Sequence, residues 1–191
     1  MPSSVPQSVF GHRIYDRTIC PDCNRVSEWD LYSNMVFSMY ANDIHTLKAK
    51  TMERLLKSLS QKVDFSTECI VDKCDGNVTL DRRIKRYPMV FAISVLWSTT
   101  SATKAQVSSV LNYLPHDLDL SAAFEPFYAE NNDSQNRRNS LKSTRYTFRG
   151  FVCYYGQHYF AFFYSTAHKS WLLLDDKLVV QVGKWSNVVD K

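Results

Sequence analysis

The sequence lacks any long hydrophobic run. Its longest apolar stretch, residues 89–97, is broken by Ser94 and falls far short of the about 20 residues that cross a bilayer. The first six residues also lack the apolar core of a secretory signal peptide. We therefore expect no membrane association and a reducing compartment, the cytoplasm or the nucleus, in which cysteines stay reduced or bind metal.

The sequence also lacks a strong excess of positive or negative charge, and it has no low-complexity segment. The 191 residues carry 23 Lys and Arg against 19 Asp and Glu, which gives a net charge of +4, and 45% of them are hydrophobic. A nucleic-acid-binding domain usually concentrates more positive charge than this. The composition is that of an ordinary globular protein, and the length fits one domain or one domain with a small appendage.

Two close pairs of cysteines are the first informative pattern. Two residues separate Cys20 from Cys23, and four separate Cys69 from Cys74. Thiolates at such spacings can converge on one tetrahedral ion, so we expect these four cysteines to bind a structural Zn2+. Because 45 residues lie between the pairs, each pair would sit at the end of a hairpin. Disulfides and unrelated free thiols are the alternatives.

Hydrophobic patterning predicts both helices and strands in the first two thirds of the chain. An amphipathic helix is expected over residues 52–59, and a second is expected between Thr103 and Pro115. The run at 89–97 predicts a fully buried strand. The remaining expected strands lie at 9–10, 14–15, 28–39 and 78–80.

Two polar segments favour surface structure. The basic run 81–86 predicts a solvated connector, with an anion-binding patch as the alternative. The polar segment 130–145 predicts a surface loop. Beyond them, alternating and aromatic-rich runs separated by short turns predict an antiparallel meander. Its expected strands are 146–155, 157–165, 171–175 and 179–182.

One histidine of this meander stands in a position that suggests chemistry. If the turn after residue 165 centres on residues 167 and 168, residue 160 lies opposite residue 175. His158 is then a diagonal neighbour of Asp175, within reach of a hydrogen bond. A carboxylate in that place orients an imidazole and stabilises its charged form. A shift of one residue would put the two on opposite faces, leaving a strand-end histidine bonded to a carbonyl.

A nucleophile for such a histidine is missing from the sequence. Cys153 lies only five residues before His158 in an apolar run, which is typical of a small buried core residue. No G-x-S-x-G segment is present, and no other cysteine stands at a helix start.

Three segments of the C-terminal third resemble the ubiquitin-specific protease family. They are GFVCYYGQHY at 150–159, WLLLDD at 171–176 and VVQV at 179–182. The resemblance is closest to the branch often called inactive, which includes plant ubiquitin-hydrolase-related proteins. The cysteine pairs resemble the zinc knuckles of the family's fingers, and residues 89–124 resemble the segment that follows them. The likeness extends from about Phe10 onward.

The resemblance implies an α+β fold of the papain-like cysteine-protease type, with an antiparallel palm sheet and zinc-knuckle fingers. The fingers would occupy about residues 10–86 and the palm, with the histidine box, about 87–191. His158 would be the general base, Asp175 its orienting carboxylate and Asp176 a neighbouring acidic group. In the family this base activates a cysteine thiolate that attacks the bond after the terminal glycine of ubiquitin.

The chain also departs from the family's pattern. The family's Gly-x-x-Asn-x-x-Asn-x-Cys-Tyr segment, which supplies the nucleophile, has no match. The family's last palm strands are expected beyond Lys191, and the helical thumb lobe is expected to be absent. We therefore expect no peptidase activity from this chain alone, and an apolar palm face that is exposed or covered by a partner protein.

Three functions stay open at this point. The first is part of a thiol-dependent deubiquitinase whose nucleophile lies outside the chain. The second is a catalytically inactive scaffold that binds ubiquitin, a ubiquitinated protein or another partner. The third and weakest is a zinc-dependent nucleic-acid-binding module, which would use the basic side chains Arg82, Arg83, Lys85 and Arg86.

Overall fold

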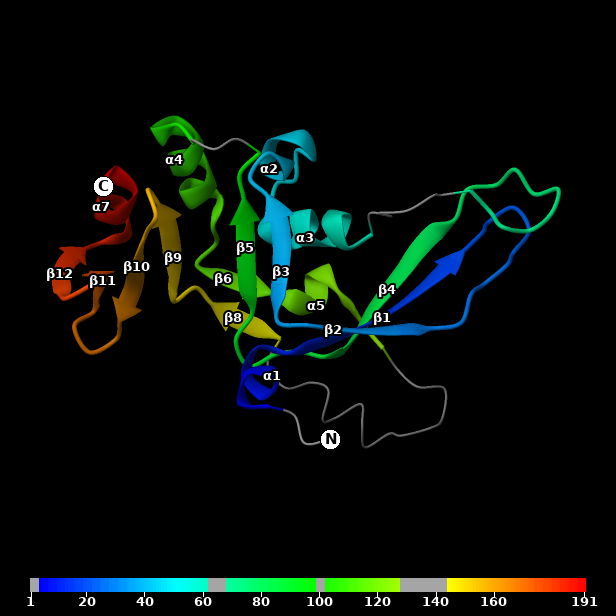
Figure 1. The fold of residues 1–191 in the computed structure, drawn as a ribbon, viewed down its shortest axis with the longest axis horizontal. Coiled ribbons are helices and arrows are strands. Elements are labelled where there is room, and N and C mark those ends of the chain that lie inside the picture. The colour runs from blue at the N-terminus through cyan, green and yellow to red at the C-terminus, as the bar shows by residue number, and fades with distance from the viewer. Residues whose placement is uncertain (1–3, 62–67, 99–101, 128–143) are drawn as a thin grey trace. The chain divides into compact units, whose positions relative to one another are not determined.

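The computed structural model describes residues 4–61, 68–98, 102–127 and 144–191 (Figure 1). The chain forms two compact units. Unit 1 comprises Met1–Thr100 and Asp117–Tyr146, and unit 2 comprises Ser101–His116 and Thr147–Lys191. None of the helices formed by the described residues has the length and apolarity that a membrane span requires.

Unit 1 is built on a four-stranded sheet with the strand order β2-β1-β4-β7. The long central pair, β1 (His12–Ile19) and β4 (Thr79–Arg86), is antiparallel, as is the pair of β1 with β2 (Asp30–Asn34). The short strand β7 (Glu125–Pro126) runs parallel to β4. The expectation of a solvated connector at 81–86 is therefore wrong, because these residues form a strand in the interior of the sheet.

An ion pair explains why this basic segment can form an interior strand. Arg82 donates two hydrogen bonds to Asp16 on β1, at 2.8 and 2.6 Å, and the Asp16 residue is only 8% exposed. A bidentate arginine–carboxylate pair compensates the loss of hydration that burial imposes on both charges. The sequence pattern showed the positive charges, but not the carboxylates that meet them across the sheet.

Smaller elements complete unit 1. A two-stranded parallel sheet joins β3 (Val36–Tyr40) to β5 (Ala92–Leu96), and β6 (Asp117–Asp119) pairs with β8 (Arg145–Thr147). The expected buried strand at 89–97 is thus shorter than predicted, and it is not fully buried, since Leu96 is 40% exposed. The helices are α1 (Val5–Phe10), α2 (Asp43–Thr46), α3 (Met52–Ser60) and α5 (Leu120–Ala123).

The core of unit 1 lies between α3, α5 and the sheets. The amphipathic pattern of 52–59 is confirmed as α3, which begins after Thr51, whose hydroxyl caps the Arg54 N–H. Leu55 and Leu56 are completely buried, and α3 packs on α5. The largest buried side chains beside them are Ile84, Leu120 and Phe124.

Unit 2 contains the predicted meander as a four-stranded antiparallel sheet with the order β12-β11-β10-β9. The strands are β9 (Gly150–Tyr155), β10 (His158–Ser165), β11 (Ser170–Asp175) and β12 (Leu178–Gly183). Helix α4 (Lys104–Tyr113) starts at a capping box formed by Thr103 and Gln106, and it contacts α7 (Trp185–Asp190). The sequence analysis had not predicted α7.

The two faces of this sheet differ in burial. On one face, Phe162 and Trp171 pack with Val188 of α7 to form the core of the unit. The opposite face carries five exposed apolar or aromatic side chains, Val152, Tyr154, Tyr159, Phe163 and Val179. This apolar face of the β9–β12 sheet is exposed, as the sequence analysis expected for the palm.

Three further expectations need correction. Residues 9–10 belong to α1 rather than a strand, because Ser4 caps a helix that has a proline in its first turn. The expected strand at 28–39 is divided between β2 and β3, and the expected strand at 146–155 between β8 and β9. The loop expected at 130–145 lies almost entirely outside the described residues.

Candidate functional site

The four paired cysteines come together at one end of the β1–β4 pair in unit 1. Antiparallel pairing sets Ile19 opposite Thr79, so the loop after β1 and the loop before β4 lie side by side, as Figure 1 shows. The sulfur of Cys20 lies 3.8 Å from that of Cys74, and the sulfur of Cys23 lies 3.6 Å from that of Cys69. All four ligand atoms lie within 4.8 Å of one another.

Each loop turns in a way that presents its two sulfurs to the same side. The Cys20 N–H donates to the Arg25 carbonyl, and the Cys69 N–H donates to the Gly76 carbonyl. Asn24 and Lys73 adopt left-handed backbone angles, with φ of 57° and 63°, which reverse the chain just after Cys23 and just before Cys74.

The two loops approach each other closely at Asp22 and Gly76, which the sequence analysis missed. A Cβ atom at Gly76 would lie 2.5 Å from the Asp22 carboxylate oxygen and 2.9 Å from its Cβ. Gly76 therefore gives Asp22 of the first loop the space to approach the second loop. The sequence signal for this close approach was Gly76 itself, a glycine two residues after Cys74.

The sulfur geometry fits a tetrahedral metal ion and excludes disulfides. A disulfide requires about 2.05 Å between sulfurs, whereas a zinc–sulfur bond of about 2.3 Å gives about 3.8 Å between ligands of a tetrahedron. The Cys23 N–H lowers the pKa of Cys20 to about 7, which favours the thiolate that a metal needs.

His158 and Asp175 form the second candidate site, in unit 2. Ala161 pairs with Leu174 in antiparallel strands, so Phe160 lies opposite Asp175. This is the register on which the sequence prediction depended. The Nε2 atom of His158 lies 2.5 Å from Oδ1 of Asp175. Because a carboxylate only accepts hydrogen bonds, Nε2 carries the proton and donates it.

Two tight hairpin turns at the same end of the sheet position this pair. Gly156 and Gln157 connect β9 to β10 in two residues, both with positive φ, as a type I′ turn requires. Asp176, with a φ of 49°, and Lys177 connect β11 to β12. His158 is therefore the first residue of β10 and Asp175 the last of β11, so the imidazole lies at the end of the two interior strands of the sheet.

The electrostatics of the pair favour a charged imidazole. The hydrogen bond to Asp175 raises the pKa of His158, and the negative charges of Asp175 and Asp176 add to this effect. The two side chains remain 45% and 38% exposed. Among the described residues, the Nδ1 atom of His158 has no hydrogen-bond partner.

Cys153 is not bonded to this histidine. It pairs with Phe160 on β10, whereas His158 pairs with Tyr155. Burial raises the pKa of the Cys153 thiol, which keeps it protonated. Within the part of the chain that the structure describes, no cysteine sulfur makes a hydrogen bond with His158.

All four basic side chains of β4 are hydrogen-bonded within unit 1, and two of them, Arg82 and Arg83, are paired with carboxylates. Arg82 is held by Asp16, and Arg83 lies 3.0 Å from Asp81, which also binds Arg17 at 2.9 Å. Lys85 donates to the Tyr15 hydroxyl. These charges are thus engaged within the protein rather than presented together to an external polyanion.

Comparison with known proteins places these features in a family. The model of the family "Ubiquitin carboxyl-terminal hydrolase" matches residues 1–189. Two curated relatives are proteins named "Ubiquitin carboxyl-terminal hydrolase 54". The rat protein is 23% identical over 202 residues, and the mouse protein is 23% identical over 199. The matches cover 100% and 98% of this chain but only 12% of either relative, so the chain spans about an eighth of their length.

Solved structures show the same fold. A chain in a structure of the yeast SAGA DUB module matches with a TM-score of 0.65 at 16% identity, covering 100% of this chain and 41% of that one. A chain in the SAGA DUB module Ubp8/Sgf11/Sus1/Sgf73 bound to monoubiquitin matches with a TM-score of 0.60 at 17% identity, covering 99% and 41%.

Proposed function

The chain belongs to the ubiquitin carboxyl-terminal hydrolase family, and from that premise we propose that it forms part of a thiol-dependent deubiquitinase. In this proposal His158 is the general base, Asp175 orients it, and the nucleophilic cysteine lies outside the 191 residues. The substrate bond follows the C-terminal glycine of ubiquitin. The observation that carries the proposal is the hydrogen bond between His158 Nε2 and Asp175 Oδ1.

The choice of nitrogen supports the role of base. Because Nε2 donates to Asp175, the proton is fixed there and the lone pair stays on Nδ1. Nδ1 is thus the atom that would accept a thiol proton, and Asp175 would stabilise the resulting imidazolium. Asp176 adds negative charge near the ring without a hydrogen bond to it within the described residues.

A structural zinc ion is part of the proposal. Cys20, Cys23, Cys69 and Cys74 supply four soft ligands at tetrahedral spacing, which fills the coordination sphere and leaves no position for a substrate. The ion would supply no chemistry beyond cross-linking the two loops and holding the cysteines as thiolates. We place the fingers at about 10–86 and the palm at about 87–191, with ubiquitin as the partner held by both.

A catalytically inactive scaffold is the second candidate. The observation that favours it is that no described cysteine is hydrogen-bonded to His158, while Cys153 is partly buried with a raised pKa. In this case the fingers and the palm would bind ubiquitin or a partner protein without cleaving a bond. The exposed face of β9–β12 would offer such a partner an apolar surface.

One titration tests the common element of both candidates. Isotope-labelled ubiquitin is titrated with the 191-residue chain while the backbone amide signals of ubiquitin are followed. We expect shifts confined to the hydrophobic patch and the C-terminal tail of ubiquitin. Unchanged spectra at high concentration of the chain would contradict ubiquitin binding by these residues.

A covalent probe separates the two candidates. The full-length protein is incubated with ubiquitin that carries a cysteine-reactive group at its C-terminus. An adduct on a cysteine outside the 191 residues, weakened by His158→Ala, is expected for the deubiquitinase. Absence of any adduct, with ubiquitin binding retained, would assign the scaffold. An adduct on Cys153 would refute the placement of the nucleophile outside the chain.

A further inference from the structure

We propose that the outer edge of β2 in unit 1 pairs with the same edge of a second copy of this chain, so that two four-stranded sheets join into one. β2 (Asp30–Asn34) is an edge strand, since the order of the sheet is β2-β1-β4-β7. All five of its residues are exposed, and the large side chains Leu31 and Tyr32 are 51% and 50% exposed. This edge lies in a different unit from His158 and contains none of the four paired cysteines.

The two edges of this sheet differ in how open they are to another strand. β7, at the opposite edge, has only two residues, and one of them is Pro126, which has no N–H to donate. Short strands, proline and lysine are common features that protect a sheet edge from pairing. β2 has five residues, and it contains neither proline nor lysine. Its backbone is therefore open to an added strand.

The register of the sheet determines which backbone groups of β2 face β1. The Phe127 N–H donates to the Ile84 carbonyl, so the backbone polar groups of Ile84 face β7 rather than β1. Ile14, which lies opposite Ile84, therefore directs its own N–H and carbonyl to its partner on β2, which is Tyr32. The backbone groups of Tyr32 are thus used inside the sheet.

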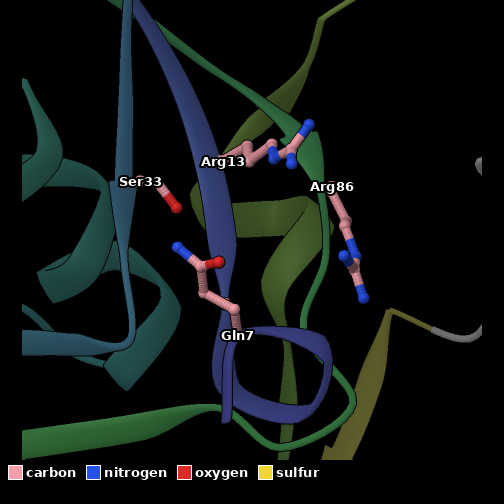
Figure 2. A pocket seen from close by; sticks show the side chains of 5 residues that line it. Gln7, Arg13, Ser33 and Arg86 are labelled. Atoms are coloured by element: carbon pink, nitrogen blue, oxygen red, sulfur yellow. The ribbon is translucent and has the colours of Figure 1, made fainter. Parts of the chain in front are cut away.

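The two neighbours of Tyr32, Leu31 and Ser33, direct their backbone groups outward. Successive residues of a strand point their N–H and carbonyl groups to opposite sides, so these two residues place two donors and two acceptors on the free edge. No hydrogen bond from another segment of the described chain reaches these four groups. Figure 2 shows Ser33 on β2, with β1 and its Arg13 beside it and β4 with Arg86 beyond β1.

An antiparallel pairing of β2 with itself, centred on Tyr32, satisfies all of these groups. In that register Leu31 lies opposite Ser33 of the second copy, and Ser33 lies opposite Leu31 of the second copy. Each of these two pairs exchanges two hydrogen bonds, so every outward group of both strands finds a partner. The two Tyr32 rings meet at the two-fold axis, where an aromatic cross-strand pair adds stability.

The charges of β2 favour the same register. Asp30 lies opposite Asn34 of the second copy, whose side-chain amide donates hydrogen bonds that a carboxylate accepts. The two Asp30 carboxylates stay roughly 14 Å apart, which is the length of four strand residues. Because the edge matches itself both in hydrogen bonds and in charge, a second copy of the chain is the occupant that fits it.

The test measures self-association of the 191-residue chain by sedimentation equilibrium at several protein concentrations. One pair of short strands is smaller than the interfaces of about 1,200 Å2 or more that stable complexes bury, so we expect a weak dimer that forms at high concentration. In the isotope-labelled chain, the amide signals of Leu31 and Ser33 should shift as the dimer forms. A chain that stays monomeric at millimolar concentration would overturn the proposal and leave this edge to an extended segment of a different protein.

A backbone variant decides whether β2 itself forms the contact. Ser33→Pro removes an outward N–H from each copy and no hydrogen bond to β1, so the sheet should still form while dimerisation weakens about tenfold or more. Ser33→Ala is the matched control, because it keeps the N–H and should dimerise as the unchanged chain does. Equal dimerisation of the two variants would place the contact elsewhere and overturn the proposal.

An exchange of charges tests the register without changing the backbone. Asn34→Asp sets a second carboxylate opposite Asp30 of the other copy and should weaken the dimer, since like charges in a cross-strand pair are destabilising. Adding Asp30→Asn to this variant sets an amide opposite a carboxylate again and should restore the dimer. A dimer that Asn34→Asp leaves unchanged, or that the double variant does not restore, would refute the pairing centred on Tyr32.

Discussion

At the scale of single residues, His158 should titrate at a higher pH than a free histidine. Its hydrogen bond to Asp175 favours the protonated ring, so Asp175→Asn should lower the pKa of His158 toward the ordinary value. The titration is followed through the imidazole C–H signals in NMR spectra. Asp176→Asn, which removes a charge but no hydrogen bond to the ring, should lower the pKa less. An unchanged pKa in Asp175→Asn would contradict the observed pairing.

A second histidine makes the opposite prediction. His12 on β1 is only 2% exposed and packs edge-on against Phe91. Burial lowers the pKa of His12 because the charged ring would lose its hydration. His12 is thus neutral in the folded protein at pH values where the unfolded chain already binds a proton.

The sign of the resulting pH dependence follows from this difference. Above the unfolded-state pKa of about 6.5, His12 is neutral in both states and has no effect. As the pH falls below that value, the free energy of unfolding should fall by up to about 1.4 kcal/mol per pH unit until the folded pKa is reached. Denaturant unfolding at several pH values measures this change in the free energy of unfolding. His12→Leu should remove this part of the dependence, whereas the exposed His45→Gln should not.

At the scale of elements, the pair of Asp16 and Arg82 should stabilise the β1–β4 strands strongly. Their side chains are only 11% and 22% exposed, so Asp16→Asn leaves a largely buried guanidinium without a counter-charge. We expect a loss of about 3 kcal/mol in the free energy of unfolding. The control is Arg145→Gln, which removes an ion pair whose arginine side chain is 84% exposed and should cost less than about 1 kcal/mol. Equal effects in urea unfolding would contradict this assignment.

Local signals predicted some elements well. The helix at 52–59 could be predicted because its apolar spacing depends on residues within one or two turns, while its start was open between Thr46 and Thr51 and the structure places the cap at Thr51. The β9–β12 meander could be predicted because each strand pairs with its neighbour across a short turn. The pairing of β10 with β11 also brought His158 to Asp175, so this contact needed no long-range information.

Elements whose partners are distant in sequence could not be predicted in the same way. The 81–86 run forms a strand only because Asp16, more than sixty residues earlier, neutralises Arg82. The run at 89–97 is more exposed than its composition suggests because β5 belongs to a sheet of only two strands. The basic run contains Arg86, but its pairing with Arg13 could not be predicted, since only the register of β1 and β4 makes the two residues neighbours.

At the scale of the whole molecule, the four paired cysteines lead us to expect that unit 1 depends on a cross-link between two of its loops. Short loops carry the four sulfurs, and Cys23 and Cys69 are separated by 45 residues of sequence. Four thiols held within 4.8 Å of one another cannot all ionise without a cation between them, because their negative charges repel. The Gly76 N–H lowers the pKa of Cys74. Burial and the neighbouring thiols raise it by more than this, so the pKa of Cys74 is raised to about 12.

We therefore predict one zinc ion per chain, with loss of structure when it is removed. Because ligand binding to the folded state alone adds to the free energy of unfolding, a strong chelator should lower the melting temperature. Cys20→Ser and Cys74→Ser should lower both zinc content, measured by elemental analysis, and melting temperature. Cys153→Ser changes a cysteine outside the cluster and should keep its zinc. Natively purified protein without zinc, or equal zinc in all three variants, would refute the metal centre and leave the sulfur cluster as four free thiols.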